Sequence, residues 1–549
     1  MLPIRNINGL IKDGEQVMKD KRFLLIFILL MLLSLVSCEE SVVPKETEIT
    51  VENEEPVEGG TINISSVEPG SLNPLLNKSK SYNEISKLIF QSLVEYDANL
   101  KIIPVLAQSW DFTDGSNKFV IKLKENVFWS DGESFTADDV KFSLDTIKAS
   151  EDSIYKGNLE HIYSYKVKDA STIEITFAQP FATAIDMLSF PIIPRHIYKS
   201  NPNAVPIGTG MFKVSEYNRL KSMELVYNDK WNGEEKPYIE KIRITFINDV
   251  DAFSIAFQSK ELDLLNTTSY DWEKYSEMKD INAYKYTTMY YDFIGLNYNN
   301  PIFQDKAVRK AMIQGINRKS IVDKYLLGNA AVTDVPINPT SWLKDADAEK
   351  YGYSRSEAQN LLMAAGFADL NNDGILERKV AEAVQQLSFT LLTNDENEFR
   401  RKAAEEIKKN LEDIGFRVEI KFAGFDDVKA AIETGEFDAV HTGYNLSNTQ
   451  DLSFAFHSTQ IDSGKNFMAY SNPEIDALLL QAYTAMDDNR RKEIYKNLQK
   501  SFREEVPCIS LFFREAALVV RDKIQGEIKP DAMNPYRSIH KWFVPESKR

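Results

Sequence analysis

From about residue 354 to the C-terminus, the sequence alternates amphipathic helices with short apolar strands. Ser354 and Glu357 form a helix-starting capping box, and a second helix is predicted over residues 398–414, where apolar residues recur every three or four positions. A strand at residues 418–422 alternates apolar and charged side chains. Helices and strands in this order pack as layers, so the pattern predicts an α/β fold. The remaining predicted elements of this half are helices at 473–484 and 490–502 and a strand at 509–513.

The first half of the chain is richer in strands. Strands are predicted at residues 61–65 and 119–123, and helices over residues 82–93 and from Thr136, whose capping partner is Asp139. A chain of 549 residues is too long for one hydrophobic core. The change of pattern between the halves therefore indicates several domains.

The N-terminal segment has the order of a secretory signal. A basic cluster at residues 19–22 precedes an apolar run over residues 23–36. This run is too short for a membrane-spanning helix, which needs about 20 residues. It ends in Leu35-Val36-Ser37-Cys38, which resembles the lipobox of bacterial lipoproteins. The resemblance implies that residues 1–37 are removed and that Cys38 becomes the lipidated first residue of the mature chain.

The residues on either side of this signal also carry information. Signal peptides begin with their basic cluster, but here a polar stretch precedes it, so Met18 is a candidate for the true start. Residues 38–57 are rich in Glu and contain few large apolar side chains, which is typical of a disordered tether. We therefore expect a folded domain that a disordered tether connects to a membrane.

Charge and cysteine content exclude some classes of partner and bond. The formal net charge of −17 repels phosphate backbones, which argues against a nucleic-acid partner. Once Cys38 is acylated, only Cys508 remains, in an apolar run that predicts a core thiol. No intrachain disulfide can then form.

Residues 437–458 have the composition of a ligand-binding loop. They begin as a short apolar strand and open into amides, hydroxyls and aromatic side chains. In open α/β sheets, ligands bind beyond the carboxyl ends of strands. The candidate ligand-binding residues are Gly443, Tyr444, Asn445, Ser447, Asn448 and Asp451.

Several motifs in the same order resemble those of the extracellular solute-binding proteins of peptide-type ABC importers, a group with oligopeptide, dipeptide and nickel binders. The resemblance extends from residue 59 to about residue 545. Its most specific motif is Phe128-Trp129-Ser130-Asp131-Gly132 with Phe135-Thr136-Ala137-Asp138-Asp139-Val140. The others include Gly59-Gly60-Thr61, Ser71-Leu72-Asn73-Pro74, Pro206-Ile207-Gly208-Thr209-Gly210, Trp231-Asn232-Gly233 and Val308-Arg309-Lys310-Ala311.

The resemblance implies a two-lobed, periplasmic-binding-protein-like fold of type II with a small extra domain, which closes around its ligand. It assigns residues 58–97, 204–286 and 505–549 to lobe one, residues 98–203 to the extra domain and residues 287–504 to lobe two. The chain would then cross between the lobes at two places.

The implied function is that of a monomeric, lipid-anchored receptor on the outer face of the cytoplasmic membrane or in the periplasm. It would capture a small peptide or related solute and deliver it to ABC permease subunits. The sequence lacks the Gly-x-x-x-x-Gly-Lys phosphate loop, so a separate ATPase must supply the energy. Two alternatives stay open: a sensor or chaperone-like binder without transport, and a relative that binds a nickel chelate or a sugar.

The ligand loop departs from its relatives at one position. In peptide-binding relatives, an Asp in this loop pairs with the terminal ammonium of the ligand, because a buried charge must be neutralised. Counted from the Gly443-Tyr444 pair, that position is Ser447, which is neutral. Asp451 is the nearest acid and is the candidate substitute. The sequence therefore leaves open whether the ligand has a free amino terminus.

Catalytic motifs are absent from the sequence. None of the five histidines lies in an HExxH motif, and no Gly-x-Ser-x-Gly elbow occurs. We therefore expect a binding protein rather than an enzyme, with no cofactor.

Two weak metal signals are interpreted as structural. His441 and His457 are sixteen positions apart without a Cys or acidic partner in register, which favours core or lining contacts over a metal site. Asp369-Leu370-Asn371-Asn372-Asp373-Gly374 matches the first six positions of a calcium loop, but position twelve is Val380 instead of Glu. This segment is therefore expected to be a turn after a helix, and no metal site is predicted.

Overall fold

The computed structural model describes residues 55–113, 117–268, 272–275, 278–348 and 350–549. Residues Pro56–Arg549 form one compact unit, which contains the regular structure of the described residues. The predictions for Met18 and Cys38, and most of the predicted tether, lie outside the described residues. Within those residues, no helix combines the length and apolarity that a membrane crossing requires.

The largest sheet has seven strands in the order β11-β19-β12-β18-β16-β17, with β13 paired to β19. β16 is parallel to both β17 and β18, whereas β12 is antiparallel to β18 and β19. Its strands are β11 (Leu264–Thr267), β12 (Ile281–Leu296), β13 (Ala330–Val332), β16 (Ser388–Asn394), β17 (Arg417–Ala423), β18 (Ala439–Asn445) and β19 (Ile509–Arg521).

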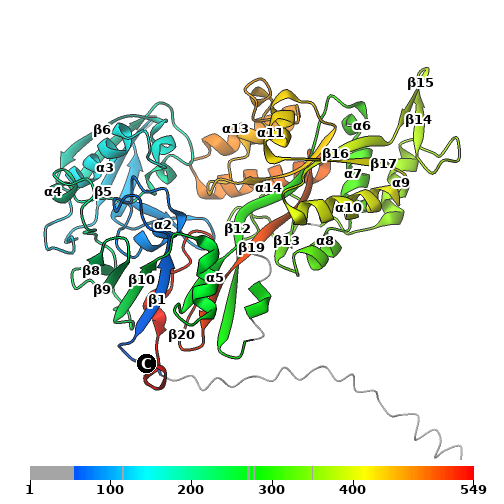
Figure 1. Ribbon diagram of the computed structural model, residues 1–549. Coiled ribbons are helices and arrows are strands. Elements are labelled where there is room, and N and C mark those ends of the chain that lie inside the picture. Colours follow the sequence, from blue (N-terminus) through cyan, green and yellow to red (C-terminus); the bar gives the residue numbers. More distant parts are fainter. Residues whose placement is uncertain (1–54, 114–116, 269–271, 276–277, 349) are drawn as a thin grey trace, which may run out of the picture. The chain divides into compact units, whose positions relative to one another are not determined.

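β12 and β19 are long paired strands that run from the strand-rich part of the molecule to the helix-rich part (Figure 1). Residue 286 lies within β12, and β19 begins shortly after residue 505. β19 extends well beyond the strand predicted at 509–513, because residues 517–520 pair with both β11 and β12. The predicted strand ended at residue 513 because Arg514 interrupts the apolar run. In the structure, Arg514 forms an ion pair with Asp292, so the strand continues past it.

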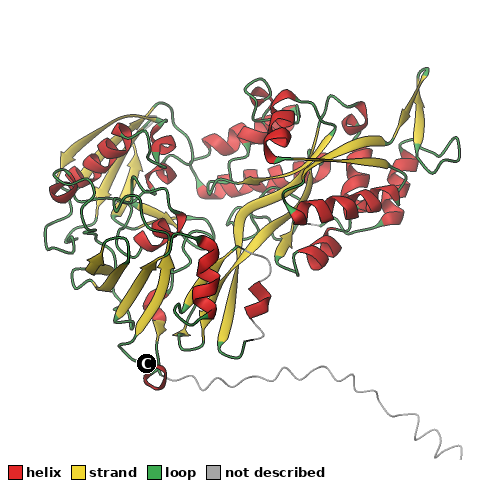
Figure 2. Cartoon of the chain, viewed as in Figure 1, coloured by secondary structure: helices red, strands yellow, loops and turns green. Residues whose placement is uncertain are grey.

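Helices cover the part of the large sheet that includes β16, β17 and β18 (Figure 2). Local caps explain where they begin: Ser354 Oγ accepts from Glu357 N at 3.2 Å, and Asn397 Oδ1 accepts from Arg400 N at 3.1 Å. The helices are α6 (Pro301–Gln304), α7 (Lys306–Gly315), α8 (Arg318–Tyr325), α9 (Arg355–Ala364), α10 (Glu398–Glu412), α11 (Phe425–Thr434), α12 (Ser453–Phe456), α13 (Pro473–Thr484) and α14 (Asp488–Glu505). The predicted alternation of helices and strands is confirmed.

The first half forms two four-stranded sheets. One has the order β1-β10-β9-β8 and the other β4-β5-β7-β6. Their strands are β1 (Thr61–Ser66), β4 (Ala107–Phe112), β5 (Lys118–Leu123), β6 (Ile162–Asp169), β7 (Thr172–Phe177), β8 (Phe212–Asn218), β9 (Ser222–Tyr227) and β10 (Lys241–Phe246). The predicted capping box of Thr136 and Asp139 is present and begins α3 (Ala137–Ala149).

The helix predicted over residues 82–93 is shorter in the structure, where α2 spans Lys80–Ser86. The carbonyls that would continue it accept hydrogen bonds from a distant segment. Gly210 N donates to Ile89 O at 2.8 Å, and Phe212 N donates to Leu88 O at 2.9 Å. These tertiary bonds replace the helical ones, and the approach is so close that a Cβ on Gly208 would lie 1.8 Å from Ile89 O.

The C-terminal segment returns to the N-terminal sheets. Trp542 and Val544 are buried in the same apolar cluster as Ile62 of β1 and Ile242 of β10. Separate clusters lie on the helix-covered part of the large sheet. The remaining strands and α-helices are β2 (Val94–Tyr96), β3 (Ile102–Pro104), β14 (Glu377–Val380), β15 (Ala383–Gln386), β20 (Gln525–Gly526), β21 (Trp542–Phe543), α4 (Arg195–Tyr198) and α5 (Val250–Gln258).

Candidate ligand-binding site

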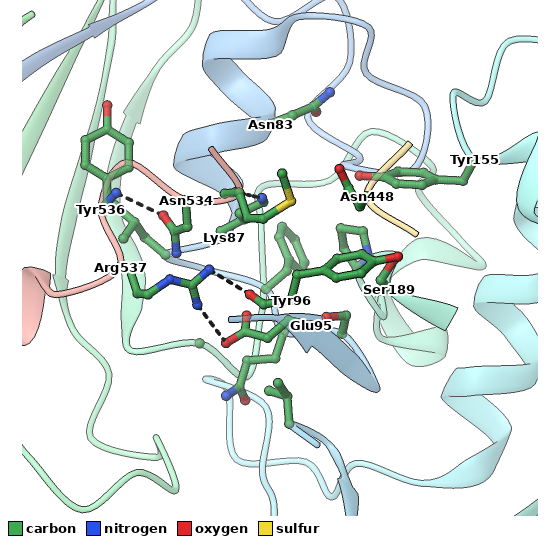
Figure 3. Close-up of a pocket in the computed structure, with 18 of the residues that line it drawn as sticks. Asn83, Lys87, Glu95, Tyr96, Tyr155, Ser189, Asn448, Asn534, Tyr536 and Arg537 are labelled. Carbon is green, nitrogen blue, oxygen red and sulfur yellow. Dashed lines mark hydrogen bonds and ion pairs between the residues drawn. The ribbon is translucent and has the colours of Figure 1, made fainter. Parts of the chain in front are cut away.

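A cavity of about 500 Å³ lies where the loop after β18 meets α2, β2 and the C-terminal segment. Figure 3 shows Lys87, Glu95, Asn448 and Arg537 around it. The lining residues belong to segments that are far apart in the sequence: 83–96, 105, 154–158, 186–191, 210–211, 231, 447–449 and 533–539. A cavity built from so many segments forms only in the folded chain.

Arg537 organises one wall of this cavity. Its Nη2 donates to the carbonyl of Tyr96 at 2.6 Å, and its Nη1 lies 3.8 Å from Glu95 Oε1, as Figure 3 shows. Arg537 Nε also pairs with Asp531. Its charge is therefore neutralised by the protein, so Arg537 holds the wall together instead of offering a free cation to a ligand.

Lys87, at the end of α2, contributes a cation to the same wall. Its Nζ donates to the carbonyl of Met533. Lys87 is an exposed residue, and desolvation by the surrounding protein lowers the pKa of its amine. Glu84 and Glu95 act in the opposite direction and favour the charged form of this amine.

Asp186 is a buried acid that lines the cavity. It is only 6% exposed, and its Oδ1 accepts a hydrogen bond from Tyr96 Oη at 2.9 Å. Burial raises the pKa of Asp186 to about 6, and the nearby Arg491 counteracts only part of this effect. Among the described residues, none forms an ion pair with this carboxylate. A buried acid that lacks a paired cation is suited to bind a cationic group of a ligand.

A second cavity, of about 230 Å³, shares Asp186 and Asn448 with the first and is also lined by Trp342 and Arg491. Arg491 Nη2 donates to the carbonyl of Thr449 at 2.9 Å, whereas its buried Nε has no hydrogen-bond partner among the described residues. The guanidinium lies over the ring of Trp342, 5.7 Å from its centroid. Opposite charges thus line one small space beside the main cavity.

Three of the six predicted ligand-binding residues line cavities. Ser447 and Asn448 line the main cavity. Asn445 lines a third cavity, of about 510 Å³, which Asn448 also borders together with Tyr290 and Glu515. Asn448 is therefore the predicted residue that all three spaces share.

The other three predicted residues have structural contacts. Tyr444 packs into an aromatic cluster, with its ring 4.9 Å from that of Phe293 and its buried hydroxyl unpartnered in the described part of the chain. Gly443 sits in β18, where a Cβ would lie 2.8 Å from Tyr291 O. Asp451 Oδ1 accepts from Ser453 N at 2.9 Å, at the start of α12. These geometries explain the residue types without a ligand, and a role in binding stays a prediction.

Asp186, Tyr96 and Arg537 are cavity residues that the sequence reading missed. Asp186 and Tyr96 lie more than 250 residues before the predicted loop and Arg537 lies after it, so their meeting depends on the tertiary fold. One sequence signal was available for Asp186, because this acid interrupts the apolar run 184–188.

The two histidines considered for metal binding have different surroundings. His441 is fully buried in β18, and desolvation together with Arg400 lowers its pKa to about 3. His457 Nδ1 accepts from Thr459 N at 3.2 Å and lies 3.8 Å from Asp476. Local contacts account for the ring of His457, whereas both ring nitrogens of His441 are buried without a hydrogen-bond partner among the described residues. That neither histidine binds a metal stays a prediction.

Cys508 is a buried free thiol, as predicted. Burial raises its pKa to about 12, although Tyr291 and Ser510 act in the opposite direction. A thiol with this pKa is not ionised near neutral pH, so it is a poor nucleophile.

Comparison with known proteins identifies what the chain resembles. Residues 101–466 match the family described as bacterial extracellular solute-binding proteins, family 5 Middle. The oligopeptide-binding protein AppA of Bacillus subtilis is 28% identical over 512 residues, which are 89% of this chain and 92% of AppA.

Solved structures agree with this match. That of Bacillus subtilis AppA in complex with a nonapeptide has a TM-score of 0.60 at 27% identity and covers 90% of this chain and 100% of AppA. That of NikZ from Campylobacter jejuni in complex with Ni(L-His) has a TM-score of 0.63 at 25% identity and covers 88% of this chain and 99% of NikZ. The expected two-lobed α/β fold of type II is thereby confirmed, while the domain boundaries stay a prediction.

Proposed function

The chain belongs to the bacterial extracellular solute-binding proteins of family 5, and we propose that it captures a small peptide or related solute between its lobes for delivery to a membrane permease. A separate ATPase would drive that permease. The family resemblance predicted from the sequence motifs is confirmed, and solute binding follows from the family. The ligand class and the delivery step are the proposal.

The proposed architecture keeps the expected boundaries: residues 58–97, 204–286 and 505–549 for lobe one, 98–203 for the extra domain and 287–504 for lobe two. The packing of Trp542 against β1 and β10 supports the grouping of distant segments in lobe one. The sheet β4-β5-β7-β6 falls within the proposed extra domain. In this scheme the protein closes by hinge motion around its ligand.

The cavity of about 500 Å³ is the observation that carries the proposal. Its walls come from all three proposed domains, through Arg537, Asp186 and Asn448 respectively. Cavities of about 300–1,000 Å³ hold small ligands. A space of this size that several domains enclose suits a short peptide, and closure would bury the peptide almost completely.

Two acids are candidates to bind a cationic group of the ligand. Asp451 is the candidate from the sequence, but one of its oxygens already accepts from Ser453 N. Asp186 borders the cavity and has no ion-pair partner among the described residues. This geometry favours Asp186, and the ligand would carry an ammonium or another cationic group near it.

Native mass spectrometry of the purified protein tests the ligand class directly. We expect a co-purified peptide, and, after unfolding and refolding to remove it, calorimetric binding of di- to pentapeptides. Peptides with a free amino group should bind at least tenfold more tightly than their N-acetylated forms. Asp186→Asn should abolish that preference, whereas Asp451→Asn should keep it. A non-peptide in the cavity, or no binding of any peptide in the set, would contradict the proposal.

Delivery and membrane attachment require cells. We propose that Cys38 carries the lipid and that residues 38–57 form the tether, with Met18 as the start of translation. Labelling with a palmitate analogue should mark the wild type and not Cys38→Ser. Peptide uptake should fall when the gene is deleted and return with the wild-type chain. Uptake that is unchanged by deletion would favour a sensor or chaperone-like binder.

A nickel chelate is the second candidate ligand. NikZ, which matches over 88% of this chain, was solved with Ni(L-His). Calorimetry with nickel and L-histidine, together and separately, distinguishes the two classes. Binding of the chelate without binding of peptides would favour this alternative.

A further inference from the structure

The loop that follows α9 brings three carboxylates together. One oxygen from each of Asp369, Asp373 and Glu377 lies within 4.8 Å of the others. Asp369 and Asp373 are exposed, whereas Glu377 is only 3% exposed. The sequence motif ended at Gly374, so the structure adds an acid that lies beyond the motif.

Glu377 carries a second, independent signal. Its Oε1 accepts from Leu370 N at 3.0 Å, but its Oε2 is buried with no hydrogen-bond partner among the described residues. A buried polar atom without a partner destabilises the fold. Such an atom beside two further carboxylates indicates that a ligand completes the site.

The fold fixes this glutamate in place. Glu377 begins β14 and forms an isolated bridge with Ala368, in which Glu377 N donates to Ala368 O and Ala368 N donates to Glu377 O, both at 2.9 Å. The bridge closes the loop so that its first and last acids meet. Gly374 has φ of 84°, which permits the sharp turn between them.

The protein itself supplies no evident counter-charge. The adjacent Arg378 forms an ion pair with Asp305, with 2.5 Å between Nη1 and Oδ2. Among the described residues, no ion pair joins a cation to Asp369, Asp373 or Glu377. Three like charges this close repel one another, and a bound cation would remove that repulsion.

We propose that Asp369, Asp373 and Glu377 bind a calcium ion. All three ligands are hard oxygens, which suit Ca²⁺ and Mg²⁺. Ca²⁺–oxygen distances of about 2.3–2.6 Å allow two ligands up to about 5 Å apart, whereas Mg²⁺ requires a tighter octahedron near 2.1 Å. The three oxygens lie within 4.8 Å of one another, a separation that Ca²⁺ can bridge, and the first six positions of the segment match a calcium loop. Backbone carbonyls and water would fill its remaining positions.

This site replaces the expectation of a metal-free turn. That expectation rested on Val380 at position twelve of the loop, where the usual calcium ligand is Glu. Val380 lies on β14 and is 50% exposed. The acid comes from position nine instead, because the chain enters a strand before it reaches position twelve.

The proposed ion would have a structural role. It would join the end of α9 to the hairpin of β14 and β15, which projects from the helix-rich part of the molecule (Figure 1). The solute cavity is lined by other segments. Calcium should therefore change stability and leave solute affinity unaltered, and this inference stands independently of the ligand proposed above.

Thermal unfolding of the full chain, stripped with EGTA and titrated with CaCl₂, tests the site. Extracellular calcium modules bind with Kd of about 10⁻⁴–10⁻³ M. At 10 mM Ca²⁺ we expect a rise in Tm of about 1–3 °C, and a smaller rise with 10 mM Mg²⁺. Calorimetry should give one calcium per chain.

Glu377→Gln should abolish the calcium response while keeping or raising Tm in EGTA, because one of three repelling charges is removed. Asp373→Asn provides a second variant if Glu377→Gln does not fold. Glu382→Gln, which changes an exposed acid of the same hairpin, is the matched control and should respond like the wild type. A wild type without a calcium response, or a Glu377→Gln variant that retains it, would overturn the proposal.

Discussion

The backbone N–H of Ala182 donates to the carbonyl oxygen of Tyr483 at 2.7 Å, which joins two segments three hundred residues apart. The ring of Tyr483 also stacks on that of Phe181, with centroids 5.5 Å apart and an interplanar angle of 13°. Nearby, Lys101 Nζ lies 2.9 Å from Asp488 Oδ2. These contacts connect the proposed extra domain with proposed lobe two, beside the second cavity. They would have to break when the lobes open.

Tyr483→Ala should therefore favour an open form. A stacked aromatic pair contributes about 0.5–1.5 kcal/mol beyond its buried area, so its loss should shift a closed–open equilibrium about threefold to tenfold. Small-angle scattering should show a larger radius of gyration for the ligand-free variant. Tyr163→Ala, which removes a 75% exposed ring from β6, is the matched control. Equal radii for Tyr483→Ala and the wild type would show that this contact does not bias closure.

Asp186→Asn should stabilise the ligand-free protein at neutral pH. Burial raises the pKa of Asp186 from 3.8 to about 6. Between these values the unfolded chain has released its proton while the folded chain still holds it, so the stability of the wild type falls as pH rises from about 4 to 6. The variant cannot lose stability in this way. Relative to the wild type, we expect its free energy of unfolding to be higher by about 1–3 kcal/mol at pH 7 and almost unchanged at pH 3.5.

Urea unfolding of both proteins at the two pH values measures this difference. A gain of equal size at both pH values would indicate a packing effect instead of a charge effect. Asp451→Asn, in the predicted loop, serves as the control, because its carboxylate is only partly buried and accepts from Ser453 N.

Gly208→Ala should destabilise the fold strongly. The new Cβ would lie 1.8 Å from Ile89 O and 2.6 Å from Ile89 C, and backbone atoms cannot move aside as a flexible side chain can. A loss of about 3–5 kcal/mol is expected. Because Gly210 borders the solute cavity, any variant that folds should also bind solute more weakly. Gly157→Ala adds a Cβ that meets no atom within 4 Å, so its Tm should match that of the wild type.

Local signals explain why much of the fold was predictable. Thr136 with Asp139 and Ser354 with Glu357 begin helices through contacts within four residues, and a sequence displays such contacts directly. The predicted end of α2 was wrong because Ile89 O accepts a hydrogen bond from Gly210 N, a contact that no local sequence pattern reveals. The starts of helices, which local caps determine, were therefore predicted better than an end that depends on hydrogen bonds from a distant segment.

The candidate site follows the same division. The loop after β18 was found because its composition is that of a ligand-binding segment, and Ser447 and Asn448 do line the cavity. Asp186 and Glu377 were missed because each is a buried acid that forms no ion pair among the described residues, and only the fold creates that burial. A sequence shows which acids exist but not which of them lack a cation.

Asp292 links three elements beneath the ligand loop, and its removal is the sharpest test of the core of the large sheet. Arg514 Nε lies 2.6 Å from Asp292 Oδ2, and Arg400 Nη2 lies 3.0 Å from Oδ1. Burial alone would raise the pKa of Asp292, but the two arginines hold it below its ordinary value. This group therefore adds stability at neutral pH that is lost as the pH falls through its folded pKa.

Asp292→Asn would leave two partly or fully buried guanidinium groups without their carboxylate. Breaking a buried ion pair from one side costs about 3–5 kcal/mol, so we expect a loss of that order in the free energy of unfolding at pH 7. Asp323→Asn, which breaks an exposed pair with Lys319 on α8, should cost less than about 1 kcal/mol. The difference between the wild type and Asp292→Asn should shrink as the pH falls below 3.8, the ordinary pKa of Asp, and through the lower pKa of folded Asp292. A pH-independent loss, or one no larger than that of Asp323→Asn, would show that Asp292 acts by shape and not by charge.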